Sequence, residues 1–333
     1  FNSISCHSSS GLESAVMPPP DCNSNRVPSK IIVRITTDNS AAPLQPNHPN
    51  APLLLWRGLE MVEILSTLSM DNDSMRAALL CGGEALRTQH GLERTGAAGV
   101  WDEDPGGTPE LIGDPRRGWN DHEDLHRMRA AIVMYPLFEN AIRGARGRGI
   151  EAHQRHIGEL MARFATVAAA NPLATRREGY TAEQLITVNE RNRWIGYPYP
   201  RLMNANAFID QAAAVVMTNV ATARELSIAR DRWVFLHGCA DGHDHWYVGE
   251  RADLHSSPAI RAASRQALAM AGKALDQMQV FDLYSCFASA VQIGCQEIGL
   301  AEDDPAAQSP GNWQGQNLLG QILMVVRAEL RSA

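Results

Sequence analysis

The pattern of residues 281–300, FDLYSCFASAVQIGCQEIGL, constrains the fold of this 333-residue chain more than any other stretch. A short apolar run with strand character passes directly into a helical pattern, which Gly299 ends. Cys286 lies at the junction. Because the first N–H groups of a helix carry partial positive charge, a cysteine there ionises more readily, and the thiolate is its reactive form. The same position also suits an inert buried cysteine, so both interpretations stay open.

Strand and helix patterns alternate along much of the chain, which predicts an α/β fold. Strands are expected at residues 30–36 (KIIVRIT), 75–83, 215–218 (VVMT), 232–236 (RWVFL) and 278–283 (MQVFDL). Helical spacing of apolar residues predicts helices over residues 53–68 and around 157–167. Ser257 followed by Pro258 predicts the start of a helix that ends at Gly272, and Thr181 with Gln184 fits a capping box.

Two segments do not fit this alternation. Residues 1–50 are rich in Ser, Asn and Pro, so most of this segment is expected to be loosely ordered. Residues 90–130 form a long polar stretch in which little regular structure is expected. Loops of this length in compact proteins usually cover a site or an interface.

The composition excludes several functional classes. Apolar residues make up 44% of the chain and charged residues 20%, as in ordinary globular proteins. A formal net charge of -7 without a basic cluster argues against binding to nucleic acid or anionic membranes. No apolar run is long enough to span a membrane, and the first residues lack a secretion signal, so a cytoplasmic location is expected. The six cysteines form no close pair, which argues against a disulfide framework or a zinc knuckle.

The segment of residues 237–255 is dense in side chains that can bind metals. They are His237, Cys239, Asp241, His243, Asp244, His245 and His255. No HExxH or CxxC spacing fixes a coordination geometry, so we expect no metal site and interpret the histidines as hydrogen-bonding groups of a substrate-facing loop. The chain also lacks GxSxG, GxGxxG and Walker sequences, so neither a serine hydrolase nor a nucleotide phosphate loop is indicated.

Several longer segments together resemble the thiolase superfamily. They are CGGEALRT (81–88), DPGGTPELIGD (104–114), YPLFENAIR (135–143), HIGELMARF (156–164), YPYPRLMNANAFIDQAAAVVMT (197–218), HDHW with ERADLHSSPAI (243–260) and DLYSCFASAVQ (282–292). The resemblance covers roughly residues 50–333. Within the superfamily the chain is similar to acetyl-CoA acetyltransferases near the sterol carrier protein thiolases.

This resemblance implies a thiolase-like α/β fold with two related α/β halves and an α-rich loop region, incomplete at both ends. The implied N-terminal half comprises residues 51–94 and 200–230, the loop region residues 95–199, and the C-terminal half residues 231–333. Missing strands would leave sheet edges exposed, so a homodimer formed through the first half is expected.

The resemblance also implies a chemistry and a site. Thiolases exchange acyl groups with coenzyme A, using cysteines, a histidine and oxyanion donors. The sequence YSCF matches the family's NEAF or HDCF motif, which places Tyr284 at the oxyanion position and Cys286 at an active-site cysteine. Asn204, Asn206, His243 and His245 are candidate polar groups of the substrate pocket. The expected substrate is an acyl-CoA thioester, without a bound cofactor.

The chain departs from the family pattern at two catalytic positions. No cysteine lies between Cys22 and Cys81, where the acyl-accepting thiol of the family is expected. No histidine follows His255, and Ser309 stands before Pro310 where a GHP histidine is expected. Two hypotheses follow from this. One is an acyltransferase of the acetyl-CoA C-acetyltransferase type, and the other is a non-catalytic acyl-CoA-binding or assembly protein of thiolase fold.

Overall fold

The computed structural model describes residues 30–35, 77–97, 117–172, 174, 176–206, 208–235, 237–238, 240, 242, 244–278, 281, 283 and 285–302. Its strands are β1 (Lys30–Ile35), β2 (Ala77–Ala85), β3 (Trp194–Gly196), β4 (Tyr199–Pro200), β5 (Asp210–Asn219) and β6 (Trp233–Phe235). Its α-helices are α2 (Leu86–Thr95), α3 (Asp121–Leu125), α4 (Ala131–Ala145), α5 (Ile150–Ala170), α6 (Ala182–Ile186), α7 (Val220–Glu225), α8 (Pro258–Ala271) and α9 (Ala288–Ile298).

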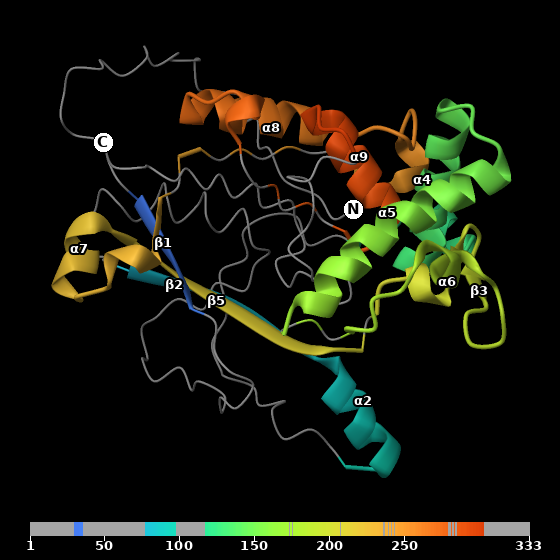
Figure 1. The fold of residues 1–333 in the computed structure, drawn as a ribbon, viewed down its shortest axis with the longest axis horizontal. Coiled ribbons are helices and arrows are strands. Elements are labelled where there is room, and N and C mark those ends of the chain that lie inside the picture. Colours follow the sequence, from blue (N-terminus) through green and yellow to red (C-terminus); the bar gives the residue numbers. More distant parts are fainter. Residues whose placement is uncertain are drawn as a thin grey trace.

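A four-stranded sheet runs through the described part of the protein in the order β2-β5-β1-β6 (Figure 1). Each neighbouring pair is antiparallel. The longest pairing joins β2 to β5, from Ala77 opposite Thr218 to Ala85 opposite Asp210. Strands β3 and β4 form a separate antiparallel pair. The mixture of sheet and helices agrees with the predicted α/β fold class.

The strand predictions are largely confirmed. The VVMT run lies inside β5, and β1 and β6 fall within the predicted residues 30–36 and 232–236. Strand β2 extends beyond the Gly82–Gly83 pair where its end was expected, because its register with β5 continues to Ala85. The sheet joins β2 and β5 to β6, which belongs to the other expected half, so the division of the chain into two halves stays a prediction.

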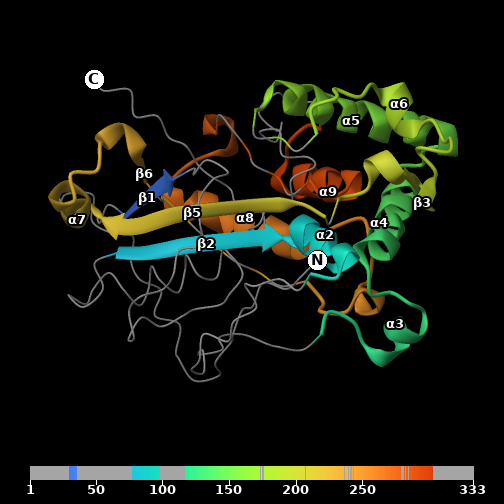
Figure 2. The same ribbon diagram turned by 90° about the horizontal axis from the view of Figure 1, so that it is seen from below.

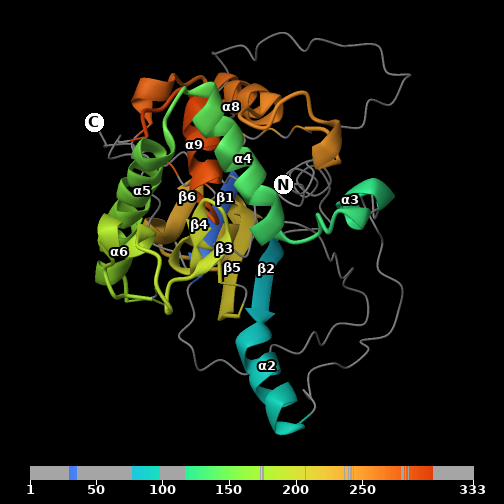
Figure 3. The same cartoon turned by 90° about the vertical axis from the view of Figure 1, so that its right-hand side faces the viewer.

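The longer helices other than α2 lie on one side of the sheet (Figure 1). Helices α4, α5, α8 and α9 lie together above it, whereas α2 projects away from the body of the molecule (Figures 1 and 3). Nearly every residue of α2 is exposed. Figure 2 shows the same arrangement from below, with α3 at the periphery. The middle of the chain contains helices α4, α5 and α6 and is therefore α-rich, as the sequence predicts.

The main core lies between α4, α5 and α9. Helix α5 contributes Ile157, Leu160 and Phe164, which follow the predicted helical spacing. Helix α9 is buried along almost its whole length, with Gln296 the exposed exception. Burial of large apolar side chains contributes about 1.5–3 kcal/mol each to folding, so α9 is held firmly by its surroundings.

Three predicted helix ends, in two helices, are confirmed. Ser257 Oγ accepts a hydrogen bond from Ile260 N at 3.3 Å at the start of α8. The helix ends at Gly272, whose φ of 61° is a left-handed conformation that favours glycine. Thr181 and Gln184 form the expected capping box at α6.

Two expectations about local structure are wrong in the residues that the structure describes, which leave out residues 98–116 and residues 279, 280 and 282. Residues 90–130 contain the end of α2 and all of α3, which Asn120 and Glu123 start with a reciprocal capping box. The described residues of the MQVFDL run lie in no strand. Phe281 and Leu283 pack into the main core, so burial accounts for the apolar character of this run.

The helix predicted over residues 53–68 lies outside the described residues. Among the helices that the structure describes, none is long and apolar enough to cross a membrane.

Candidate functional site

Cys286 lies immediately before Phe287, the N-cap residue of α9. Its side chain is half-buried and packs against the main core. Phe287 is fully buried, and its ring stacks on Tyr135 of α4 with a centroid separation of 4.4 Å. The residue after the cysteine is thus fixed by the core, while the cysteine itself stays partly accessible. This placement agrees with the predicted position at the start of a helix.

Asn204 is a second predicted site residue with an unusual environment. Its side-chain nitrogen donates to the carbonyl oxygen of Pro200 at 2.8 Å. Its Oδ1 atom is buried and has no hydrogen-bond partner among the described residues. The neighbouring residues Leu202 and Ala205 pack against the same core cluster as Cys286. A buried acceptor without a partner requires an explanation, and a ligand donor is one.

The other predicted pocket residues are less informative. Asn206 bonds with the backbone of Phe208 through both ends of its amide and so stabilises a local turn. His245 is exposed in the loop that leads toward α8. His243 and Tyr284 lie outside the described residues. In the part of the chain that the structure describes, no three His, Cys, Asp or Glu side chains are grouped to hold a metal ion.

Asp244 anchors the loop between β6 and α8. Its carboxylate accepts hydrogen bonds from Ser257 Oγ at 2.5 Å and from Ala259 N at 3.2 Å, and it pairs with Arg251 at 3.1 Å. These contacts place a negative charge at the N-terminus of α8, where the helix dipole favours it. Asp244, a potential metal ligand by sequence, is therefore a structural residue.

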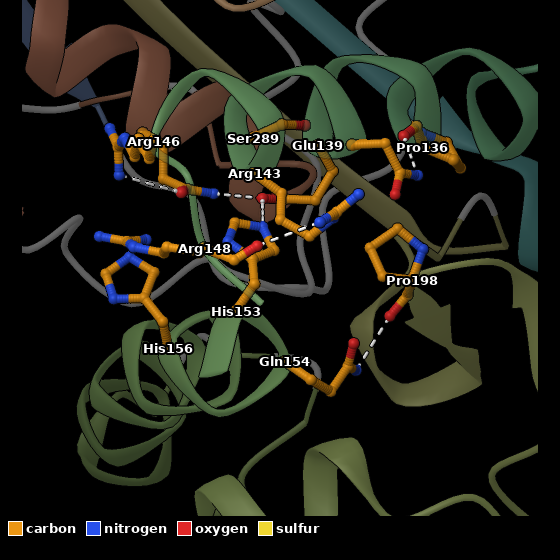
Figure 4. Close-up of polar contacts among 12 residues, drawn as sticks. Pro136, Glu139, Arg143, Arg146, Arg148, His153, Gln154, His156, Pro198 and Ser289 are labelled. Carbon is orange, nitrogen blue, oxygen red and sulfur yellow. Dashed lines mark hydrogen bonds and ion pairs between the residues drawn. The ribbon is translucent and has the colours of Figure 1, made fainter. Parts of the chain in front are cut away.

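A buried polar cluster is centred on Glu139 of α4, which Figure 4 shows together with His153 of α5 and Ser289 of α9. Glu139 is completely buried. Its Oε1 atom lies 2.7 Å from His153 Nε2 and accepts from Gln292 Nε2 at 2.7 Å. Its Oε2 atom accepts from the hydroxyl of Tyr199 at 2.5 Å. We call Glu139, His153, Tyr199, Ser289 and Gln292 the Glu139 cluster.

Tyr199 links this cluster to the backbone of α9. Its hydroxyl oxygen accepts from Ser289 N at 3.3 Å and lies 3.0 Å from Ser289 Oγ. Burial, together with the negative charge and hydrogen bond of Glu139, raises the pKa of Tyr199 well above its usual value. The phenol therefore keeps its proton at physiological pH.

A more peripheral ionic group adjoins the Glu139 cluster through Arg146. This residue donates to Gln292 Oε1 at 3.3 Å and forms an ion pair with Glu302. Glu302 also contacts His156 Nε2 at 2.6 Å. Burial raises the pKa of Glu302, but the hydrogen bond from His156 and the charge of Arg146 outweigh it, so the pKa lies below its usual value. Through Glu302, the segment that follows α9 is thus held against the end of α4 and against α5.

The Glu139 cluster was not predicted from the sequence. The sequence does contain one signal for it, because polar residues occupy core positions of two helices. Glu139 occupies the apolar stripe of α4 with Tyr135, Phe138 and Ile142. His153 stands one turn before Ile157 on the buried face of α5. A charged or polar residue at a core position of a helix requires a buried partner. The identity of that partner depends on the tertiary fold.

Comparison with known proteins finds one matching family and several similar proteins. Residues 240–312 match the family described as thiolase C-terminal domain-like. The crystal structure of a monomeric SCP2-thiolase like protein type 1 from Mycobacterium smegmatis is 32% identical, with a TM-score of 0.59. That match covers 81% of this chain and 51% of the mycobacterial chain, so this chain spans about half of that protein.

Two further similarities support less: one shows similarity of fold alone, and the other covers only a short stretch of sequence. The Ltp2-ChsH2(DUF35) aldolase is 16% identical, with a TM-score of 0.50 over 80% of this chain and 65% of that chain, which shows similarity of fold alone. A stretch of 33 residues is 82% identical to the GTP pyrophosphokinase of Escherichia coli (strain K12), and one of 31 residues is 74% identical to that of Photobacterium angustum. Each stretch covers 4% of the kinase, too little to support an inference about activity.

The sheet, the covering helices and the cysteine at the start of α9 define an α/β protein of thiolase-like fold. The family match and this structural similarity support a protein of the thiolase superfamily, similar to an SCP2-thiolase like protein.

Proposed function

We propose that this protein acts on acyl-CoA thioesters as a thiolase-like acyltransferase, with Cys286 as its reactive thiol. The observation that carries the proposal is the position of Cys286, half-buried and one residue before the N-cap of an 11-residue helix. No side chain caps α9 at Phe287. A helix N-terminus favours negative charge nearby, as a cysteine thiolate requires.

In the proposed transfer step, the Cys286 thiolate attacks the carbonyl carbon of the thioester. The carbon–sulfur bond to coenzyme A then breaks, coenzyme A leaves as its thiolate, and the acyl group stays on the cysteine. Tyr284 is the proposed donor to the oxygen on which charge develops. In the alternative role, Cys286 would exchange a proton with the α-carbon or with the leaving thiolate.

Asn204 is the proposed contact for the pantetheine arm of coenzyme A. This arm contains two amides, each with an N–H donor. The buried Oδ1 atom of Asn204 is an acceptor without a partner among the described residues, and its flanking residues adjoin the same core as Cys286. An amide N–H would satisfy this acceptor. Asn206, His243 and His245 remain proposed pocket residues without such support.

The expected result of a turnover assay is that the purified protein cleaves acetoacetyl-CoA in the presence of coenzyme A. Replacing Cys286 with alanine should reduce turnover at least about 1,000-fold, because it removes the group on which bond formation depends. Cys295→Ala is the matched control, since Cys295 lies fully buried within α9, and it should keep most of the turnover. Equal rates for the two variants would contradict a catalytic role of Cys286.

A second candidate function is a non-catalytic acyl-CoA-binding or assembly protein. It is favoured by the absence of a cysteine between Cys22 and Cys81 and of a histidine after His255. Loss of a single catalytic group commonly costs a factor of about 100 to 1,000 in rate. Calorimetry showing acyl-CoA binding without turnover, unchanged by Cys286→Ala, would favour this candidate over the acyltransferase.

The assembly state and location remain proposals. Strand β2 is an outer strand of the described sheet, so its far edge offers backbone groups for pairing. We propose a homodimer formed through this region. A cytoplasmic location and the absence of a resident cofactor are proposed on the sequence alone.

A further inference from the structure

We propose that Tyr199 is a positioning residue for the reactive cysteine. Its hydroxyl, oriented by Glu139, fixes the first turn of α9 and thereby the backbone that carries Cys286. This inference rests on the proposed function of Cys286 as the reacting thiol. Tyr199 belongs to the YPYP segment and lies 87 positions before Cys286 in the sequence, so the inference assigns a distant residue to the site.

The direction of the hydrogen bonds follows from the chemistry of the partners. A carboxylate accepts hydrogen bonds and donates none, so Tyr199 gives its single proton to Glu139 Oε2 at 2.5 Å. The lone pairs of the phenol oxygen then face the backbone N–H of Ser289 and its Oγ atom. The N–H of Ser289 belongs to the first turn of α9, where helix N–H groups have no partner within the helix.

Glu139 holds α9 at two successive turns. It acts on Ser289 through Tyr199, and it accepts directly from the side chain of Gln292, one turn further along. His153 Nε2 contacts the same oxygen as Gln292 and keeps the carboxylate in place from α5. Two contacts a turn apart restrict both the rotation of α9 and its movement along its axis.

Because Phe287 joins Cys286 to α9, holding α9 in place also limits the position of Cys286. Phe287 stands between Cys286 and α9, and its ring packs at 4.4 Å from Tyr135 and at 5.2 Å from Tyr199. Tyr199 therefore contacts the segment twice, through its hydroxyl at Ser289 and through its ring at Phe287. Removing the hydroxyl leaves the ring contact intact and releases the polar one. A misplacement of about 1 Å near a reacting group can cost about 100-fold in rate.

The test compares Tyr199→Phe with Tyr197→Phe, which removes a hydroxyl from a tyrosine two residues away that is 43% exposed. Two properties are measured for each: turnover of acetoacetyl-CoA, and the pH profile of Cys286 alkylation by iodoacetamide, followed by peptide mass spectrometry. For Tyr199→Phe we expect kcat to fall about tenfold or more with KM within about twofold, because positioning and not binding is impaired. The alkylation profile should shift to higher pH, because the helix start no longer supports the thiolate. Tyr197→Phe should behave as the wild type.

A folded Tyr199→Phe protein whose alkylation profile matches the wild type would overturn the proposal. If Tyr199→Phe does not fold, Glu139→Gln decides, since it keeps the size of the buried side chain but removes the carboxylate that orients the Tyr199 hydroxyl. Its profile should shift in the same direction, and an unshifted profile would overturn the proposal. If the wild type shows no turnover but the profile shifts, the acyltransferase fails while the positioning role of Tyr199 stands.

Discussion

Replacing Glu139 with alanine should lower the free energy of unfolding by about 3–5 kcal/mol, because removing one partner of a buried polar cluster leaves the others uncompensated. Glu139 is completely buried and is contacted by His153, Gln292 and Tyr199 at 2.5–2.7 Å. Without the carboxylate, all three would lose the acceptor that they share.

Chemical denaturation of Glu139→Ala, Glu139→Gln and Glu159→Ala measures this effect. Glutamine keeps the size of the side chain and one acceptor oxygen, so Glu139→Gln should lose about 1–3 kcal/mol. Glu159 is an exposed glutamate on α5, and its replacement should change stability by less than about 0.5 kcal/mol. A Glu139→Ala protein as stable as Glu159→Ala would show that the Glu139 cluster does not hold α9.

The second large effect is expected for Phe287→Ala, which should cost about 3–5 kcal/mol by opening a cavity in the main core. Phe287 is fully buried between Tyr135 and Tyr199, and its stacking on Tyr135 is nearly parallel, at 16°. Such aromatic contacts contribute about 0.5–1.5 kcal/mol beyond the area they bury. The substitution changes the residue that joins Cys286 to α9.

Thermal unfolding compares Phe287→Ala with Phe208→Ala, whose ring is 53% exposed and contacts His90 at 4.9 Å. Phe208→Ala should cost less than about 1 kcal/mol, because most of the ring is already in water. Similar losses for the two variants would mean that the core around α9 is not closely packed. In Phe287→Ala, Cys286 should also react with a wider range of thiol reagents than it does in the wild type.

The elements predicted well from sequence are those with local causes. Ser257, Pro258 and Gly272 bound α8 because capping and left-handed conformations depend on neighbouring residues only. The VVMT run forms part of β5 because apolar β-branched residues favour a strand in most contexts. The Thr181–Gln184 capping box is local in the same sense.

The elements that could not be predicted have distant causes. Glu139 meets Tyr199 and Gln292 across 60 and 153 residues, separations at which hydrophobic periodicity carries no information. Helix α3 has one local signal that was overlooked, the capping box of Asn120 and Glu123, and one distant contact, in which the buried Glu123 accepts from Gly249 N at 2.6 Å. Cys286 was found because its signal, a strand-like run that becomes helical, is local. The residues that hold it in place were missed because they come from α4, α5 and β4.

The central claim, that Cys286 is the reactive thiol of an acyl-CoA site, is tested most directly by mass spectrometry of the protein after incubation with acetyl-CoA. We predict the mass increase of one acetyl group, located by peptide mapping on Cys286 and absent from Cys286→Ala. Cys295, which is fully buried, should remain unmodified in the same sample. Acetyl-CoA that leaves Cys286 unmodified while the protein is folded, or that modifies the wild type and Cys286→Ala equally, would contradict the account.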